Sequence, residues 1–143
     1  MSLQRKQNWP ELLAEFISER KDVPFKWGTN DCGLFACDAV LLMTGVDLAD
    51  GVRGEYASEE GAAIVVGESV KGDLWEFAER IAAGYGIPAI SVLRAQRGDI
   101  ALCKSALGPT LGIVAMNGKE ILIPGPEGLK GIPLKMCEKA WRI

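Results

Sequence analysis

The stretch from Trp27 to Gly45 constrains the fold most, because it joins a tight glycine loop to a polar helix start and a long apolar run. Asn30 or Asp31 can accept hydrogen bonds from the free backbone amides of a first helical turn. Gly45 suits the left-handed residue just past a helix end. The stretch therefore predicts a loop followed by a helix over residues 31–44, buried on several sides.

Cys32 falls at the N-terminus of this predicted helix. Aligned peptide dipoles and unpaired amides favour a thiolate there, and a lowered thiol pKa makes a cysteine nucleophilic. The alternative is a buried cysteine that acts as a small hydrophobic residue. Position alone leaves both interpretations open. Asp38, the one charge of the helix, either faces solvent or pairs with a residue that the sequence does not identify.

Helical signals fill the first part of the chain. Asn8 is a good N-cap residue and Pro10 suits a first turn, and the apolar residues that follow keep helical spacing. We expect two further helices, a short one over about 58–66 and one that Asp73 caps and Gly84 ends.

Strand signals fill the rest of the chain. Asn117-Gly118 predicts a two-residue hairpin turn. Helices followed by an antiparallel run indicate an α+β fold. The expected strands cover residues 87–92, 100–103, 111–116, 120–124, 132–134 and 140–143.

Composition narrows the function classes. The 143 residues suit a single domain over 1–143, with 48% hydrophobic and 24% charged residues. A net charge of −3 without a basic block gives no electrostatic footprint for nucleic acid. No apolar run approaches the length of a membrane span, and no signal-peptide pattern is present, so we expect cytoplasmic synthesis.

Cysteine spacing gives no metal site. The four cysteines stand at 32, 37, 103 and 137, without Cys-x-x-Cys spacing and without any histidine to join them. We therefore expect no metal ion and no other cofactor. Cys37, Cys103 and Cys137 lie in apolar surroundings and are predicted to be core or near-core residues.

Two groups of motifs, one around the cysteine and one downstream, stand out: Trp27-Gly28, Asp31-Cys32-Gly33, Arg97-Gly98-Asp99, Leu111-Gly112-Ile113-Val114 and Asn117-Gly118. They resemble the papain-like cysteine peptidases of the NlpC type, with matching order and spacing from about residue 25 to residue 125. The resemblance implies a papain-like, NlpC-like fold, in which N-terminal helices pack on a C-terminal antiparallel sheet. It also implies that Cys32 is an active or vestigial nucleophile, with Asp31 beside it.

This sequence departs from the family at its other catalytic positions. The histidine that serves as general base would stand at Thr110 or Leu111, and the third polar member would fall near Ile123. The tyrosine that helps to hold the oxyanion in the family corresponds to about Phe25. A cysteine peptidase without a base must find its thiolate and its leaving-group proton elsewhere.

The whole chain resembles more closely a set of short phage and prophage proteins from tail gene clusters. That resemblance includes the loop with Arg53 and Tyr56, which we expect to brace the cleft or to contact a ligand. The residues expected to line or bind at the cleft are Trp27, Asn30, Arg53, Tyr56 and Thr110.

Three functions compete. The first, which we favour, is a phage tail or tail-assembly protein that keeps the fold with an impaired peptidase site. It would associate with other tail proteins or a peptide or cell-wall ligand, and with virions. The second is a cysteine hydrolase of peptide or peptidoglycan bonds that uses Cys32 with a carboxylate base or a partner-supplied histidine. The third is another thiol-dependent activity, such as acyl transfer.

Overall fold

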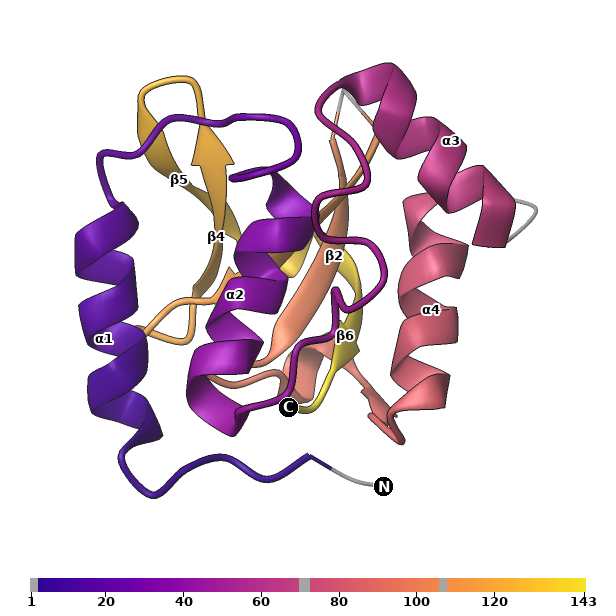
Figure 1. Cartoon of the computed structure of the whole chain (residues 1–143). Helices are drawn as coiled ribbons and strands as arrows, with labels where there is room; N and C mark the ends of the chain where they lie inside the picture. Colours follow the sequence, from indigo (N-terminus) through magenta and orange to yellow (C-terminus); the bar gives the residue numbers. More distant parts are fainter. Residues whose placement is uncertain (1–2, 70–72, 106–107) are drawn as a thin grey trace.

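The structure is a computed structural model that describes residues 3–69, 73–105 and 108–143 (Figure 1). Its helices are α1 (Trp9–Arg20), α2 (Cys32–Thr44), α3 (Glu59–Ser69) and α4 (Leu74–Gly84), with short 3-10 helices η1 (Val92–Arg94) and η2 (Leu134–Met136). Its strands are β1 (Ala89–Ile90), β2 (Ile100–Ser105), β3 (Gly108–Val114), β4 (Glu120–Gly125), β5 (Gly128–Pro133) and β6 (Cys137–Trp141).

The six strands form one antiparallel sheet in the order β1-β6-β2-β3-β4-β5. The last strand, β6, therefore lies between β1 and β2 rather than at an edge. In Figure 1 helix α2 lies in front of this sheet, with α1 on its left and α4 on its right, and α3 packs beside α4 at the upper right. The α+β prediction, with helices on an antiparallel sheet, is confirmed.

Helix α2 begins one residue after the predicted start and ends at the predicted residue. The Asp31 carboxylate accepts a hydrogen bond of 2.9 Å from the backbone N–H of Leu34, which satisfies a free amide of the first turn. Gly45 takes a left-handed conformation with φ 81°, and its N–H donates to the Leu41 carbonyl. The helix buries residues on most of its sides, namely Leu34, Phe35, Ala36, Ala39, Val40 and Met43.

The sheet has an apolar cluster on each face. Leu102 and Ile113 point toward the helices and join the larger core with residues of α1, α2 and α4. Their chain neighbours Cys103 and Val114 belong to the second cluster on the opposite face. This division follows from the alternation of side chains along a strand.

Asp99 holds the turn before β2 to both ends of the described chain. Its side chain is fully buried and accepts hydrogen bonds from Arg5 at 2.8 Å, from the Gln96 N–H at 2.9 Å and from the Ile143 N–H at 3.1 Å. The guanidinium of Arg142 lies 3.0 Å from its second oxygen. Asp99 therefore has a structural role at this turn.

Three local predictions are wrong in detail. Asn8 makes no side-chain capping bond, because its backbone (φ −96°, ψ 23°) is not in the extended conformation of a capping residue. The strand predicted over 87–92 shrinks to β1, because the Ser91 hydroxyl accepts from the Leu93 N–H and starts η1. The other predicted strands shift at their ends by a few residues.

The hairpin between β3 and β4 has four connecting residues instead of two. The Ala115 N–H donates to the Glu120 carbonyl at 2.8 Å, which leaves 116–119 as the connection. The Asn117 side chain accepts from the Lys119 N–H at 2.9 Å, so it stabilises a longer turn locally.

Within the described residues, no helix combines the length and the apolar character needed to cross a membrane.

Candidate functional site

The loop before α2 is closed by backbone hydrogen bonds between Lys26 and Asn30, in both directions, at 3.1 and 2.8 Å. Gly28 turns this loop with φ +84°. A Cβ atom there would overlap the backbone carbonyl of Tyr56, so only glycine allows the close approach. The loop thereby brings the segment around Tyr56 against the start of α2.

Asp31 is the anchor of this arrangement. Besides capping α2, its carboxylate accepts a 3.1 Å hydrogen bond from the Gly28 N–H and a 2.6 Å hydrogen bond from the Tyr56 hydroxyl. Asp31 is 2% exposed, so these donors stabilise a buried carboxylate. Burial and the bond to Asp31 raise the pKa of Tyr56, which therefore stays a neutral donor.

Cys32 is the first residue of α2 and is partly buried. Burial raises the pKa of its thiol to about 11, and the negative charge of Asp31 acts in the same direction. The backbone amides of Leu111 and Gly33 donate toward the sulfur and oppose this rise, but they do not cancel it. At neutral pH the thiol of Cys32 is therefore almost entirely protonated.

Leu111, rather than Thr110, faces Cys32 across the site. Its amide donates to the sulfur, and its side chain lines the same cavity as the thiol. In the β2–β3 register Leu111 pairs with Leu102, which points toward the helices, and Thr110 pairs with Cys103, which points away. Of the two positions considered from the sequence, Leu111 therefore faces the cavity beside Cys32.

A chain of charged side chains fixes the segment 46–56 to α1 and α2. Asp38 accepts from Arg20 at 2.8 Å and from Arg53 at 2.6 Å, so the alternative in which it pairs is correct. Arg53 also binds Asp47 at 2.9 Å, and this bond lowers the pKa of Asp47.

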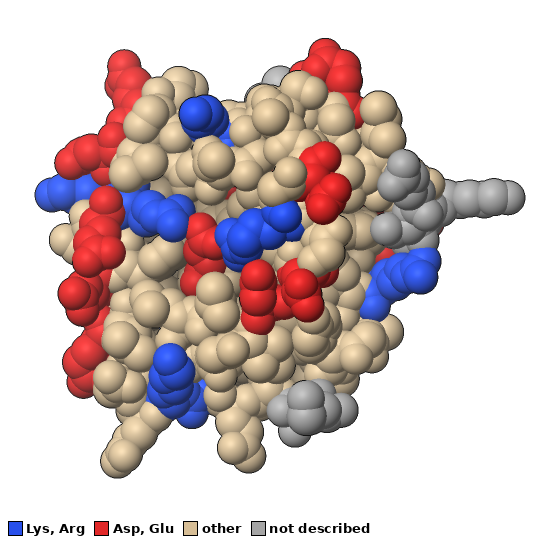
Figure 2. All heavy atoms as spheres, in the orientation of Figure 1, with Lys and Arg blue, Asp and Glu red and all other residues tan. Residues whose placement is uncertain are grey.

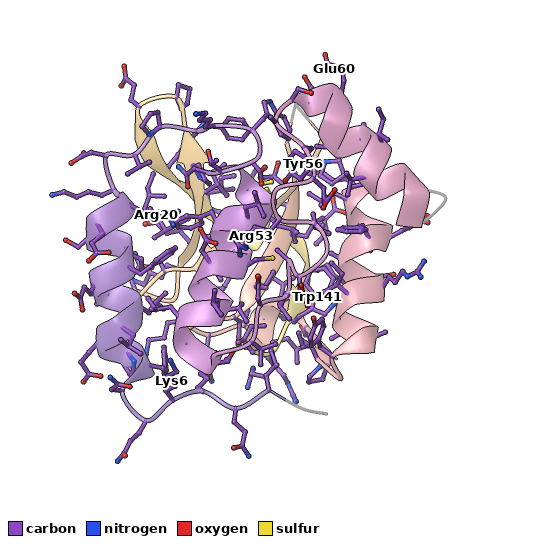
Figure 3. All side chains as sticks on the ribbon, in the orientation of Figure 1. Lys6, Arg20, Arg53, Tyr56, Glu60 and Trp141 are labelled. Atoms are coloured by element: carbon purple, nitrogen blue, oxygen red, sulfur yellow. The ribbon has the colours of Figure 1, made fainter. Side chains whose placement is uncertain are left out.

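Figure 3 shows Arg20 reaching from α1 toward Arg53 in front of α2, with Tyr56 near the N-terminal end of that helix. In Figure 2 the same central area carries interleaved acidic and basic side chains, whereas acidic side chains line the α1 edge.

Asn30 belongs to this support rather than to an open surface. It is 5% exposed, its amide donates to the carbonyls of Val23 and Pro24, and its oxygen accepts from Arg20 at 3.0 Å. Arg20 therefore links the loop before α2 to Asp38. Arg20 was not among the residues predicted for the site.

A cavity of about 490 Å³ opens beside Cys32, between α2, the helix pair α3–α4 and the sheet. Of the predicted site residues, Trp27, Asp31, Cys32 and Tyr56 line it. Asn30, Arg53 and Thr110 are not among its described lining residues.

The contribution of α3 and α4 to this cavity was missed at the sequence level. Helix α4 lines the cavity with apolar residues that recur at helical spacing, and this spacing could have identified them in the sequence. They include Leu74, Phe77, Ala78 and Ile81.

The chemistry available at the site is limited. The ionisable side chains that line the cavity, among the described residues, are the carboxylates Asp31, Glu59 and Asp73, the cysteines 32 and 37 and Tyr56. Burial raises the pKa of Cys37 to about 12. Across the described ranges, no three side chains of the metal-binding types come together to hold an ion.

These features define an NlpC/p60-type papain-like fold with a cysteine at the start of its central helix. The solved NlpC/p60 domain of the peptidoglycan hydrolase SagA has a similar structure, with a TM-score of 0.55 and 20% sequence identity over 93% of this chain and 97% of that chain. Residues 4–143 match the family described as "Domain of unknown function (DUF6950)", and the chain belongs to that family. No curated protein matches the sequence.

Proposed function

We propose that this NlpC/p60-like domain is a phage or prophage tail or tail-assembly component that binds at its cysteine site and does not cleave peptide bonds by itself. One observation carries the loss of activity: Cys32 meets the backbone amide and apolar side chain of Leu111 where the related peptidases place their base. General acid–base assistance is usually worth about 10²–10⁴-fold in rate.

The electrostatics support the same conclusion. A helix N-terminus contributes about 0.3–1 kcal/mol at exposed sites, which is less than one pKa unit. The thiol pKa of about 11 agrees with this small effect, since burial outweighs the amides. Asp31 is a poor substitute base, because its two oxygens already accept three hydrogen bonds.

The tail role rests on the resemblance to proteins of tail gene clusters. We propose that the chain is made in the cytoplasm and joins virions, with tail proteins or a peptide or cell-wall ligand as partners. Mass spectrometry of purified virions from a phage-induced host tests this role. Recovery of the chain at stoichiometric ratio supports it, and its absence from virions and tail intermediates contradicts it.

Incubation of the purified protein with muropeptides tests the loss of catalysis. We expect no release of stem peptides above the level of the Cys32→Ala variant, because both lack an effective nucleophile–base pair. Turnover that disappears in Cys32→Ala would show an active hydrolase.

The second candidate is a cysteine hydrolase whose general base is supplied by a partner molecule. The favouring observation is that Cys32 keeps its helix N-terminus and the donation from Leu111 that would assist a thiolate. Imidazole at millimolar concentration supplies a diffusible base. Turnover that depends on both imidazole and Cys32 supports this candidate, whereas inactivity with imidazole and with tail-protein partners contradicts it.

A further inference from the structure

Helices α3 and α4 give the cavity beside Cys32 an apolar wall. Val65 and Val66 from α3 and Phe77 and Ala78 from α4 line it and stay half-buried. Among the described side chains of α3 none is fully buried, and α4 buries Ala82. The two helices therefore direct much of their apolar surface toward this space.

The size and lining of the cavity suit a small apolar ligand. Its volume of about 490 Å³ lies within the range of roughly 300–1,000 Å³ that is typical of ligand sites. The opposite wall comes from α2 through Leu34 and Ala36, and the floor comes from Ile100 and Leu111 of the sheet. An aliphatic chain gains binding free energy from burial against all of these surfaces.

Charge selects the head group of such a ligand. The carboxylates of Asp31, Glu59 and Asp73 line the cavity, and no lysine or arginine does so among the described residues. Asp31 is buried, and its recorded hydrogen bonds come from neutral donors. A carboxylate ligand would meet like charges here, whereas an ammonium group would meet opposite ones.

We propose that this cavity binds a single-chain aliphatic ammonium compound, with the alkyl chain between α2, α3 and α4 and the ammonium group on the side of Glu59. The inference deepens the proposed function, since it names a ligand class for the same site. Binding is non-covalent, and the Cys32 thiol contributes surface rather than a bond.

Three probes of equal chain length test the proposal: decylammonium, decanol and decanoate, each below its critical micelle concentration. Isothermal titration calorimetry measures affinity, and a change in tryptophan fluorescence, to which Trp27 and Trp141 of the cavity lining contribute, reports occupancy. We expect saturable 1:1 binding in the order decylammonium, decanol, decanoate. No saturable binding, equal affinity for all three, or preference for decanoate overturns the proposal.

Two variants place the ligand in the cavity. Ala78→Phe and Ala62→Phe fill it from α4 and from α3, and each should weaken decylammonium binding at least tenfold. The control is Ala83→Phe, an exposed position of α4 that does not line the cavity. Circular dichroism verifies that each variant is folded, and either folded filling variant suffices. Binding unchanged in both would contradict the location.

Glu59→Gln tests the head-group contact at an exposed position. It should weaken decylammonium about two- to fivefold, the range of a surface charge pair, and leave decanol unchanged. Equal effects on both probes would contradict a charge contact. The muropeptide assay is a separate experiment. If the protein neither binds the probes nor cleaves muropeptides, only this inference is rejected. If it cleaves muropeptides in a Cys32-dependent way, the proposed function is rejected.

Discussion

Replacing Leu111 with histidine puts an imidazole on the strand position that faces Cys32. The backbone amide of Leu111 already donates to the sulfur, and its side chain lines the same cavity. A protonated imidazole within about 4–6 Å of the sulfur favours the thiolate. In Leu111→His an imidazolium–thiolate pair should therefore shift part of Cys32 to the thiolate near neutral pH, where the thiol with its pKa of about 11 is otherwise protonated.

Alkylation by iodoacetamide measures this shift, with peptide mass spectrometry to follow Cys32 alone between pH 6 and pH 11. The thiolate fraction at neutral pH should rise by up to about 100-fold in Leu111→His, because the imidazole is only partly protonated there. The rate should rise less than the fraction, because a thiolate of lower pKa is less nucleophilic. Leu111→Gln, a polar and non-titrating replacement, is the matched control, and Cys32→Ser gives the background.

The substitution also has a stability cost that the experiment must follow. Leu111 is 9% exposed, and burial of a leucine side chain is worth about 1.5–3 kcal/mol. Leu111→His and Leu111→Gln should both lower the free energy of unfolding by an amount of this order in urea titrations. Identical alkylation profiles of the two variants in the folded state would refute the assignment of Leu111 as the residue opposite Cys32.

Three further substitutions test the supports of the site. Asp31→Ala removes a helix cap and leaves a tyrosine hydroxyl and a loop amide without their acceptor, so urea unfolding should show a loss of about 2–4 kcal/mol. The hydrogen bond from Arg53 lowers the pKa of Asp47 in the folded state below its unfolded value of about 4. The bond therefore stabilises the folded protein fully above that unfolded value, and this contribution is lost as the pH falls through the lower pKa of the folded state. Asp47→Asn should flatten that part of a stability–pH profile, and an unchanged profile would contradict the contact. Gly128→Ala would push a methyl group into the backbone after α1 and should lower the melting temperature more than Gly118→Ala, which also has positive φ but meets open space.

The predictions that succeed depend on neighbouring residues. Asp31 and Gly45 are capping types at the two ends of one apolar run, and both take those roles in the structure. Asp73 caps α4 by accepting from the Trp75 N–H in the same way. Such hydrogen bonds span a few residues, so the sequence pattern contains both partners.

The predictions that fail or stay open depend on distant residues. Asp38 meets Arg20 from α1 and Arg53 from the following loop, and nothing in the helix itself identifies these partners. The choice between Thr110 and Leu111 depends on the β2–β3 register, where a shift of one residue exchanges the two faces. The position of β6 between β1 and β2 depends likewise on the assembled sheet.

The two residues of the Asp-Cys pair at the start of α2 have separate roles, which the sequence alone does not distinguish. The structure gives Asp31 three donors that join the cap, the loop before α2 and Tyr56, so this aspartate is needed for the shape of the site with or without catalysis. Cys32 lies between that anchor and Leu111, in a position where burial keeps its thiol protonated. The contacts of the pair therefore account for a wall of the cavity more directly than for a nucleophile, and the reactivity of Cys32 and the stability of Asp31→Ala can be measured apart from each other.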